Sequence, residues 1–197
     1  ALARERFLEI MEREAQRMNR LVSDLLSLSQ VEAVERMRPN EEVDVSRLLQ
    51  ETATTLAPVA EARGVRLKVV NADRLVKMAG DRDQLRQIFI NLIENAIKYG
   101  GPNNEVSVTL SDTSYQTLLR CEGIAISVVD KGPGIDALDI PRLTERFYRI
   151  DSHRSREMGG TGLGLAIVKH IVSRHRGVLK IDSAVGKGSE FKIILPV

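Results

Sequence analysis

Residues 87–99 read Gln-Ile-Phe-Ile-Asn-Leu-Ile-Glu-Asn-Ala-Ile-Lys-Tyr, and this stretch predicts a helix on which both the fold and the chemistry depend. Because an α-helix advances by about 100° per residue, four polar residues of this stretch share one stripe. They are Asn91, Glu94, Asn95 and Lys98. A solvated face would give the same stripe, although such faces usually carry Lys–Glu pairs. Two carboxamides, a carboxylate and an ammonium could instead hold a hydrated divalent cation together with phosphate oxygens.

The composition describes a globular chain and excludes several classes of function. Of 197 residues, 43% are hydrophobic and 28% are charged, which is enough for one domain with an appendage. The net charge of +2 is too small to argue for a nucleic-acid partner. The single cysteine, Cys121, excludes an internal disulfide and a thiolate metal site. No apolar run reaches the roughly 20 residues that cross a bilayer, and no signal peptide is visible, so we expect a cytoplasmic chain.

Residues 1 to about 37 are predicted to form one long helix with an apolar seam. Apolar residues recur at spacings of three and four, as in a coiled coil. The seam consists of Leu8, Met11, Ala15, Met18, Val22 and Leu25, and it is widened by Phe7, Leu21 and Leu28. Such a broad seam favours a four-helix arrangement, although a helix packed on its own domain would also show it. Pro39-Asn40 separates this helix from the remainder of the chain.

The remainder alternates helices with strands. Helices are expected from Ser46, as the N-cap, to about Arg63, from Asp81 to residue 99, and from the glycine-rich segment 159–165 to about His175. Strands are expected near residues 42–45, 65–70, 75–79, 105–111, 124–130, 179–183 and 190–196, with 75–79 as the hairpin partner of 65–70. This order predicts a two-layer α/β sandwich in which helices cover one face of a mixed sheet.

Two glycine-rich segments could contact a ligand. Asp130-x-Gly132-x-Gly134 follows an apolar strand, where the carboxylate could accept a hydrogen bond from an exocyclic amine while the glycines let the backbone approach a flat ring. The segment 160–164, Gly-Thr-Gly-Leu-Gly, precedes a helix whose free N–H groups favour phosphate. Alone, each segment would be interpreted as an ordinary turn. The P-loop and dinucleotide glycine patterns are both absent from the sequence.

The polar segment between these two clusters is predicted to be a mobile lid that reaches Met158. Phe147 and Tyr148 would anchor it, and Arg149 would contact a phosphate. As an isolated stretch, the same segment would be interpreted as a surface loop. Gly186-x-Gly188-Ser189-x-Phe191 by itself indicates only a turn into the last strand.

Taken in order, these segments resemble the sequence boxes of sensor histidine kinases of two-component systems. The resemblance covers essentially the whole chain, and it is closest to the orthodox type that includes the phosphate-regulon sensors. It implies that residues 39–197 form the ATP-binding catalytic domain, a GHKL (Bergerat) sandwich. Residues 1–38 contain Phe7-Leu-x-Ile-x-x-Glu12 and Arg17-Met-x-x-Leu-Val-x-Asp24-Leu-Leu. They are similar to the second helix of the family's dimerisation and phosphoacceptor hairpin.

The resemblance also implies roles for individual residues. Asn95 would ligate Mg²⁺ with support from Asn91, and Glu94 would act as a base or orient the acceptor imidazole. Lys98 would contact phosphate, so that Glu94, Asn95 and Lys98 form the catalytic set. Asp130 would recognise the adenine amino group. The implied ATP-binding residues are Asn91, Asn95, Lys98, Tyr99, Asp130, Gly132, Gly134, Ile135, Tyr148, Arg149, Gly160, Thr161, Gly162, Leu163, Gly164 and Ser189.

One element of the family pattern is missing. The phosphoacceptor histidine of the family lies in a His-Glu-Leu-Arg-x-Pro-like segment, and this sequence has no such segment. Its histidines are His153 in the lid and His170 and His175 on the last helix. Because Ala1 falls within a helical pattern, we expect an excised fragment that starts after the missing helix, the alternative being a naturally degenerate protein. This chain alone is therefore not expected to autophosphorylate.

The implied function is transfer of the ATP γ-phosphate to a histidine outside this chain, for relay to an aspartate of a response regulator receiver domain. The resemblance of residues 1–38 to a dimerisation hairpin helix implies a homodimer. The resemblance to this family is also consistent with a parent protein anchored at the inner membrane of a bacterium. One alternative is a nucleotide-sensing or scaffolding module without phosphotransfer. Another is a GHKL ATPase, but those enzymes place a water-activating Glu four residues before the Mg²⁺-binding Asn. Asn91 occupies that position here.

Overall fold

The computed structural model describes residues 2–33, 38–101, 104–150 and 160–197. Its helices are α1 (Leu2–Ala33), α2 (Val45–Glu61), α3 (Arg82–Tyr99) and α5 (Gly164–Arg174), with a 3₁₀ turn, η1 (Ile140–Arg142). Its strands are β1 (Glu41–Asp44), β2 (Arg66–Val70), β3 (Lys77–Gly80), β4 (Glu105–Leu110), β5 (Ser114–Gln116), β6 (Cys121–Asp130), β7 (Val178–Ala184) and β8 (Gly188–Pro196).

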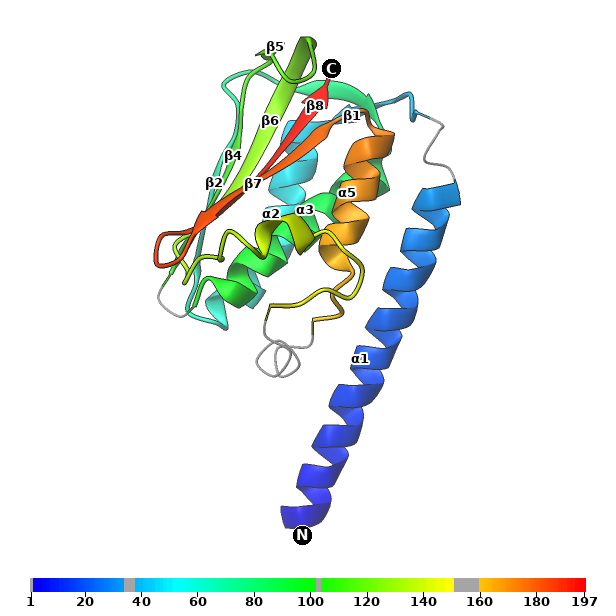
Figure 1. Cartoon of the computed structure of the whole chain (residues 1–197), viewed down its shortest axis with the longest axis vertical. Coiled ribbons are helices and arrows are strands. Elements are labelled where there is room, and N and C mark those ends of the chain that lie inside the picture. The colour runs from blue at the N-terminus through cyan, green and yellow to red at the C-terminus, as the bar shows by residue number, and fades with distance from the viewer. Residues whose placement is uncertain (1, 34–37, 102–103, 151–159) are drawn as a thin grey trace.

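A mixed sheet forms one layer of the domain, and helices form the other. The strand order is β2-β4-β6-β8-β7, with β5 paired to β6, and a separate small sheet joins β1 and β3. Strands β2 and β4 are parallel, whereas the pairs β4–β6, β6–β8 and β7–β8 are antiparallel. Helices α2, α3 and α5 lie on the same side of this sheet, and α1 runs beside α5 and extends away from the domain (Figure 1). The predicted two-layer α/β sandwich preceded by one long helix is confirmed.

The predicted hairpin between residues 65–70 and 75–79 is wrong. Strand β3 pairs with β1, with Glu42 opposite Ala79, while β2 pairs in parallel with β4. The hairpin was expected because the two strands are close in sequence, but each strand pairs with a segment farther along or back in the chain. Leu67 of β2 and Met78 of β3 both pack on the same hydrophobic core, so burial alone does not distinguish the two pairings. The β5 segment was not predicted.

The predicted N-cap of α2 is also wrong. Asp44, and not Ser46, caps this helix, because its Oδ1 accepts a hydrogen bond from the N–H of Arg47 at 2.9 Å. A carboxylate at this position also interacts favourably with the helix dipole. The hydroxyl of Ser46 instead accepts a hydrogen bond from the N–H of Val76 at 3.1 Å, which attaches α2 to the segment before β3.

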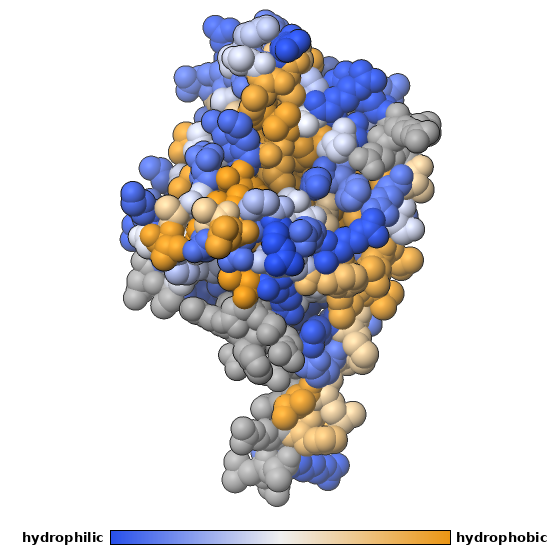
Figure 2. Space-filling view, viewed as in Figure 1, coloured by the Kyte–Doolittle hydropathy of each residue, from blue (hydrophilic) through white to orange (hydrophobic). Residues whose placement is uncertain are grey.

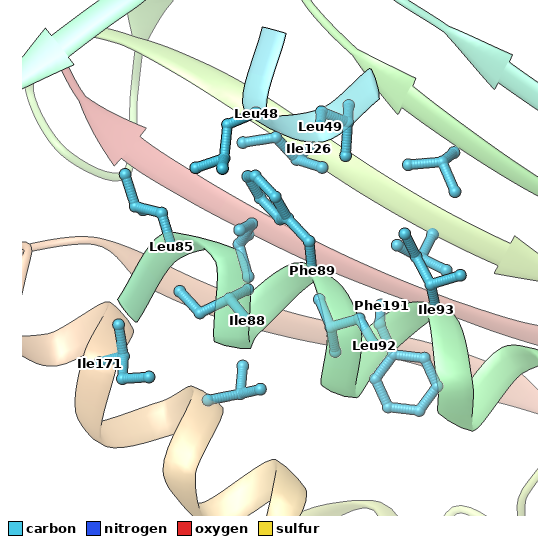
Figure 3. Packing of buried hydrophobic residues seen from close by; sticks show 14 of the residues in the cluster. Leu48, Leu49, Leu85, Ile88, Phe89, Leu92, Ile93, Ile126, Ile171 and Phe191 are labelled. Carbon is cyan, nitrogen blue, oxygen red and sulfur yellow. The ribbon is translucent and has the colours of Figure 1, made fainter. Parts of the chain in front are cut away.

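Helix α3 is the centre of the core. Asp81 opens this helix, as predicted, and is its N-cap, since Asp81 Oδ1 accepts a hydrogen bond from the N–H of Gln84 at 3.1 Å. Figure 3 shows Phe89 pointing from α3 toward Leu48 and Leu49 of α2. The apolar residues of α3 that are buried are Leu85, Ile88, Phe89, Leu92, Ile93, Ala96 and Ile97. The polar stripe identified from the sequence is the part of the second half of this helix that stays partly accessible.

Most of α1 is not covered by this chain. All six residues of the predicted seam are exposed, among them Met18 at 60% and Val22 at 57%. Apolar side chains are visible on the surface of α1 in Figure 2. Leu28 and Val31, by contrast, are buried, and Leu21 packs against the same core. The end of α1 therefore docks on the domain while its seam remains free. Among the described residues, no helix is both long and apolar enough to span a bilayer.

His175, at the end of α5, is a buried neutral ring held by two backbone groups. Its Nε2 accepts a hydrogen bond from the N–H of Asp81 at 3.1 Å, and its Nδ1 lies 2.8 Å from the carbonyl oxygen of Ile171. Nδ1 therefore carries the proton. Burial lowers the pKa of His175, because protonation would place a charge in the core and turn Nε2 into a donor that faces another donor.

Acidification should destabilise the fold through His175. Because its pKa is lowered in the folded state, its stabilising contribution is complete above the ordinary histidine pKa of about 6.5 and is lost as the pH falls below it. Urea unfolding from about pH 7.5 to about pH 5.5 measures this loss. His175→Gln keeps a donor and an acceptor but does not titrate, so its unfolding free energy should fall less with pH. Equal pH slopes for the two proteins would contradict the assignment.

Candidate functional site

The polar stripe of α3 forms one wall of the candidate site. Lys98 Nζ donates a hydrogen bond to Glu94 Oε2 at 2.5 Å, and both side chains are partly buried. The Nδ2 atom of Asn91 is buried and has no hydrogen-bond partner among the described residues. A buried donor without a partner costs free energy, which a bound anionic acceptor such as a phosphate oxygen would recover.

The same stripe could contribute to a cation site. In the ranges that the structure describes, no three His, Cys, Asp or Glu side chains come together to bind a metal. The carboxamide oxygens of Asn91 and Asn95, together with oxygens of a ligand, could supply a cation site without such a cluster. Such an oxygen-only set, completed by water and phosphate, is the kind that Mg²⁺ prefers, so these residues fit that ion.

Asp130 forms a second part of the site, at the end of β6. Its side chain is only 5% exposed, and Oδ1 accepts a hydrogen bond from the N–H of Gly132 at 2.8 Å. Burial raises the pKa of Asp130, and hydrogen bonds from the N–H groups of Gly132 and Ser189 partly oppose that shift. Two donors use only part of the accepting capacity of a carboxylate. The buried oxygens can thus accept a further hydrogen bond from a ligand N–H group.

The glycines after Asp130 are needed for close backbone contacts. A Cβ atom on Gly132 would lie 2.8 Å from the carbonyl oxygen of Tyr99 and 2.9 Å from Cα of Gly100. Gly134 has φ of +71°, and a Cβ there would lie 1.9 Å from the carbonyl oxygen of Ala184. The end of α3 and the turn after β6 (residues 130–134, the Asp130 turn) are therefore packed backbone against backbone. This contact places Tyr99, which is 40% exposed, beside the Asp130 turn.

Two serines complete this end of the site. The Ser183 hydroxyl accepts a hydrogen bond from the N–H of Ile135 at 2.9 Å, and its oxygen lies 3.0 Å from the hydroxyl oxygen of Ser189. Ser189 is opposite Asp130 in the β6–β8 ladder. Ile135 and Ser189 were predicted from the sequence, but Ser183 was not, because a serine in a strand carries no signal of its own.

The N-terminus of α5 meets the polar stripe of α3. A Cβ atom on Gly164, the first residue of α5, would lie 3.2 Å from Asn91 Oδ1. Among the residues that the structure describes, no side chain caps α5, so the N–H groups of its first turn and the positive end of its dipole are available to an anion. Leu163 is fully buried and can contribute only through its backbone. Gly162, at φ of +76°, accepts a hydrogen bond from the N–H of Phe147 at 2.9 Å.

The described part of the predicted lid is anchored by Tyr148. Its hydroxyl donates a hydrogen bond to Asp139 Oδ1 at 2.5 Å, and the guanidinium of Arg142 lies 4.1 Å from the centre of its ring. The hydroxyl of Tyr148 is thus used within the protein, whereas Phe147 is 56% exposed and Arg149 is partly buried. Residues 151–159, with His153 and most of the predicted lid, lie outside the described residues.

Helix α1 contacts both segments that border the site. The Thr161 hydroxyl donates a hydrogen bond to Asp24 Oδ2 at 2.6 Å and accepts one from the N–H of Leu163 at 3.3 Å. Glu32 interacts with Arg146, and its Oε1 lies 3.2 Å from Nε2 of His170. These contacts were not predicted, because each joins residues more than a hundred positions apart. No sequence motif contains both partners of any of these contacts.

Comparison with known proteins agrees with this geometry. Residues 80–197 match the family model described as histidine kinase-, DNA gyrase B-, and HSP90-like ATPase. The chain is 40% identical over 186 residues to the phosphate regulon sensor protein PhoR of Pseudomonas aeruginosa, covering 94% of this chain and 40% of that protein. It is 35% identical over 191 residues to the sensor histidine kinase WalK of Bacillus subtilis, and the match covers 97% of this chain and 30% of that protein. The chain thus spans less than half of each of these two relatives.

Solved structures give the same result. The full-length ShkA structure in complex with AMPPNP superposes with a TM-score of 0.78 at 26% identity, over 98% of this chain and 38% of that one. The mycobacterial sensor histidine kinase MprB superposes with a TM-score of 0.66 at 27% identity, over 80% of this chain and 97% of that one.

The hydrogen bond between Asp24 and Thr161 should stabilise the docked end of α1. Asp24→Ala removes the acceptor and, because Ala is the best helix former, does not weaken the helix itself. We expect faster amide hydrogen exchange in residues 21–33 and 160–164, with an effect of about 1 kcal/mol on local opening. Asp73→Ala, an exposed aspartate between β2 and β3, is the matched control. Unchanged exchange in both segments would show that Asp24 does not hold α1.

Proposed function

Because the chain belongs to the family of histidine kinase-, DNA gyrase B- and HSP90-like ATPases, we propose that it is the ATP-binding catalytic portion of a sensor histidine kinase. It would transfer the ATP γ-phosphate to a histidine outside this chain, and a response regulator would then receive the phosphate on an aspartate. The observation that carries the proposal is that three parts of the structure converge. They are the polar stripe of α3, the uncapped N-terminus of α5 and the buried Asp130.

The Asp130 end of the site suits adenine. The buried carboxylate would accept a hydrogen bond from the 6-amino group, which a base with a carbonyl at that position could not donate. Gly132 and Gly134 leave room for the ring to approach the backbone, Ile135 supplies apolar contact, and Tyr99 would lie along the nucleotide. Ser189 supports this end by hydrogen bonding to Asp130 through its N–H group.

The α5 end of the site suits the phosphates. The backbone N–H groups from Gly162 to Gly164 and the helix dipole would attract their negative charge, with Arg149 and Lys98 as cationic contacts. The Nδ2 donor of Asn91, which has no partner among the described residues, would gain a phosphate oxygen. Asn95, supported by Asn91, would hold Mg²⁺, which when bound neutralises phosphate charge. Gly160 and Thr161 would shape the turn before α5.

The chain's own residues would mainly position the reactants. In phosphoryl transfer, orientation and charge neutralisation provide most of the rate. Glu94 is fixed by its 2.5 Å hydrogen bond from Lys98. It could orient the incoming imidazole or accept its proton as the ring nitrogen bonds to the γ-phosphorus and the bond to the bridging oxygen of ADP breaks. Tyr148, through Asp139, would hold the anchored side of the lid.

We further propose that residues 1–38 are the second helix of a dimerisation and phosphoacceptor hairpin, and that residues 39–197 are the catalytic domain. The exposed seam of α1 supports this division, since six apolar side chains in heptad spacing need a partner helix. A second copy of the chain and an upstream helix would cover the seam in a homodimer. The parent protein would be anchored in the bacterial inner membrane, with this portion in the cytoplasm.

A second candidate function is nucleotide sensing without phosphotransfer. The hydrogen bond between Asp24 of α1 and Thr161, beside the proposed phosphate turn, favours it, because nucleotide binding could then report directly to the helix. A GHKL hydrolase is less well supported, since Asn91 stands where those enzymes place the water-activating glutamate.

Phosphohistidine formation tests the proposed function. The parent protein, containing this chain and its upstream helix, should take label from γ-labelled ATP with Mg²⁺, and the label should be acid-labile and base-stable. Asn95→Ala should prevent labelling, because it removes the proposed Mg²⁺ ligand, whereas Asn40→Ala, at an exposed position before β1, should not. Absence of label in a protein that demonstrably binds ATP would favour the nucleotide-sensing alternative.

Asp130→Asn should weaken ATP binding far more than it affects folding. Loss of a hydrogen bond to a buried carboxylate is worth about 1.5–3 kcal/mol, which predicts a roughly 10- to 100-fold rise in Kd. Folding should change less than binding, because Asn keeps an oxygen for the N–H of Gly132 and removes a carboxylate that burial disfavours, which offsets any weakening of the bond from the N–H of Ser189. Titration with a fluorescent ATP analogue and urea unfolding measure the two effects, with Asp182→Asn on exposed β7 as control. Unchanged affinity would show that Asp130 does not bind the adenine base.

A further inference from the structure

We propose that Asn104 is a positioning residue that sets the adenine end of the site, by fixing the last residues of α3 against the Asp130 turn. The inference rests on the proposed ATP site but concerns a residue outside all the sequence boxes described above. Asn104 lies just before β4, and its side chain is a carboxamide buried to 9% exposure. A buried carboxamide needs several partners at once, so its surroundings indicate its role.

Both ends of the Asn104 side chain are used. Its Nδ2 donates a hydrogen bond to the carbonyl oxygen of Gly100 at 2.5 Å, and its Oδ1 accepts one from the N–H of Glu105 at 2.7 Å. The backbone carbonyl of Asn104 also accepts a hydrogen bond from the N–H of Arg66 at 2.9 Å, which ties it to β2. Gly100 is the C-cap of α3, whose last carbonyls have no partner within the helix. Asn104 therefore attaches the end of α3 to the edge of the sheet.

The residue that Asn104 holds is in contact with the Asp130 turn. A Cβ atom on Gly100 would lie 2.6 Å from Asn104 Nδ2 and 3.5 Å from Cβ of Asp130, so these three residues meet at one point. On the other side, Gly132 fits against the backbone of Tyr99 and Gly100, and its N–H group donates to Asp130 Oδ1. A shift of Gly100 would move or release Gly132 and change how Asp130 is held.

The chemistry of the carboxamide explains why this position suits Asn. Only a side chain with a donor and an acceptor on one short stem can bond the Gly100 carbonyl and the Glu105 N–H together. An Asp at this position keeps the volume and the acceptor but places an oxygen against the Gly100 carbonyl. An Ala removes both bonds without adding charge. Comparing the two variants therefore separates the effect of losing the hydrogen bond from Asn104 to Gly100 (the Asn104 clamp) from the effect of a new charge near Asp130.

Nucleotide selectivity tests the proposal. In the whole chain, Asn104→Ala and Asn104→Asp should each raise the Kd of an ATP analogue by about tenfold, the equivalent of one hydrogen bond. The Kd of a matching GTP analogue, measured in parallel, should change less. The ratio of the GTP-analogue Kd to the ATP-analogue Kd, which measures the preference for adenine over guanine, should therefore become smaller. Asn71→Asp, an exposed Asn whose Nδ2 donates to Gln50 Oε1 at 3.4 Å, is the control and should leave both values unchanged. An equal loss for both nucleotides would indicate a general structural role and overturn the proposal.

A double-mutant cycle and an experiment without nucleotide complete the test. If Asn104 acts through the Asp130 turn, Asn104→Ala should have little further effect on ATP affinity in an Asp130→Asn background. Additive effects would contradict the proposal.

In the protein without nucleotide, Asn104→Ala should accelerate amide exchange of Gly132 while the middle of α3 stays protected. Unchanged exchange would overturn the clamp even if the chain bound no ATP, so this result is independent of the proposed function.

Discussion

The burial of α3 is the constraint on which the rest of the structure depends. Leu85, Ile88, Phe89, Leu92 and Ile93 are each no more than 1% exposed. Full burial of one such side chain contributes about 1.5–3 kcal/mol, so the five together contribute on the order of 10 kcal/mol, comparable with the net stability of a whole domain. This helix cannot rotate to satisfy its polar residues. The sheet and α2 pack against its apolar residues, and Asn91 of its polar stripe lies beside Gly164 of α5.

The candidate site forms where element ends meet this fixed helix. Helix ends carry backbone groups without partners, and the central strand β6 ends in the same region. The uncapped first turn of α5 lies against Asn91, and the C-terminus of α3 lies against Gly132. The contact at Gly132 is close enough to require glycine, because a Cβ atom there would lie 2.8 Å from the carbonyl oxygen of Tyr99, so this part of the wall of the site is backbone. A wall made of backbone is preorganised, because it loses little side-chain entropy when a ligand binds.

The sequence predicted what depends on local periodicity and local chemistry. The stripe on α3, the start of this helix at Asp81 and the strand that ends at Asp130 follow from the spacing of apolar residues and from single side chains. The side-chain hydrogen bonds of Asn104 are local, to Gly100 and Glu105, but they belong to no motif. The pairing of β3 with β1 and the contact of Asp24 with Thr161 depend on which distant segment lies alongside. Neither residue type nor spacing encodes that information in one sequence. Asp44 replaced Ser46 as the cap of α2 for a similar reason, since the bend between β1 and α2 decides which side chain can reach the helix N–H groups.

The position of Asp24 connects the two parts of the chain energetically. Its carboxylate accepts a hydrogen bond from Thr161, beside the positive end of the α5 dipole. If the phosphates of ATP bind at this turn, as proposed, they bring negative charge to the place where α1 already contributes one. Repulsion between like charges would make nucleotide binding weaken the docking of α1, and linkage requires that docking weaken nucleotide binding by the same factor. The docked end of α1 and its exposed seam belong to one continuous helix, so a change in the docking of α1 also changes how the seam is positioned.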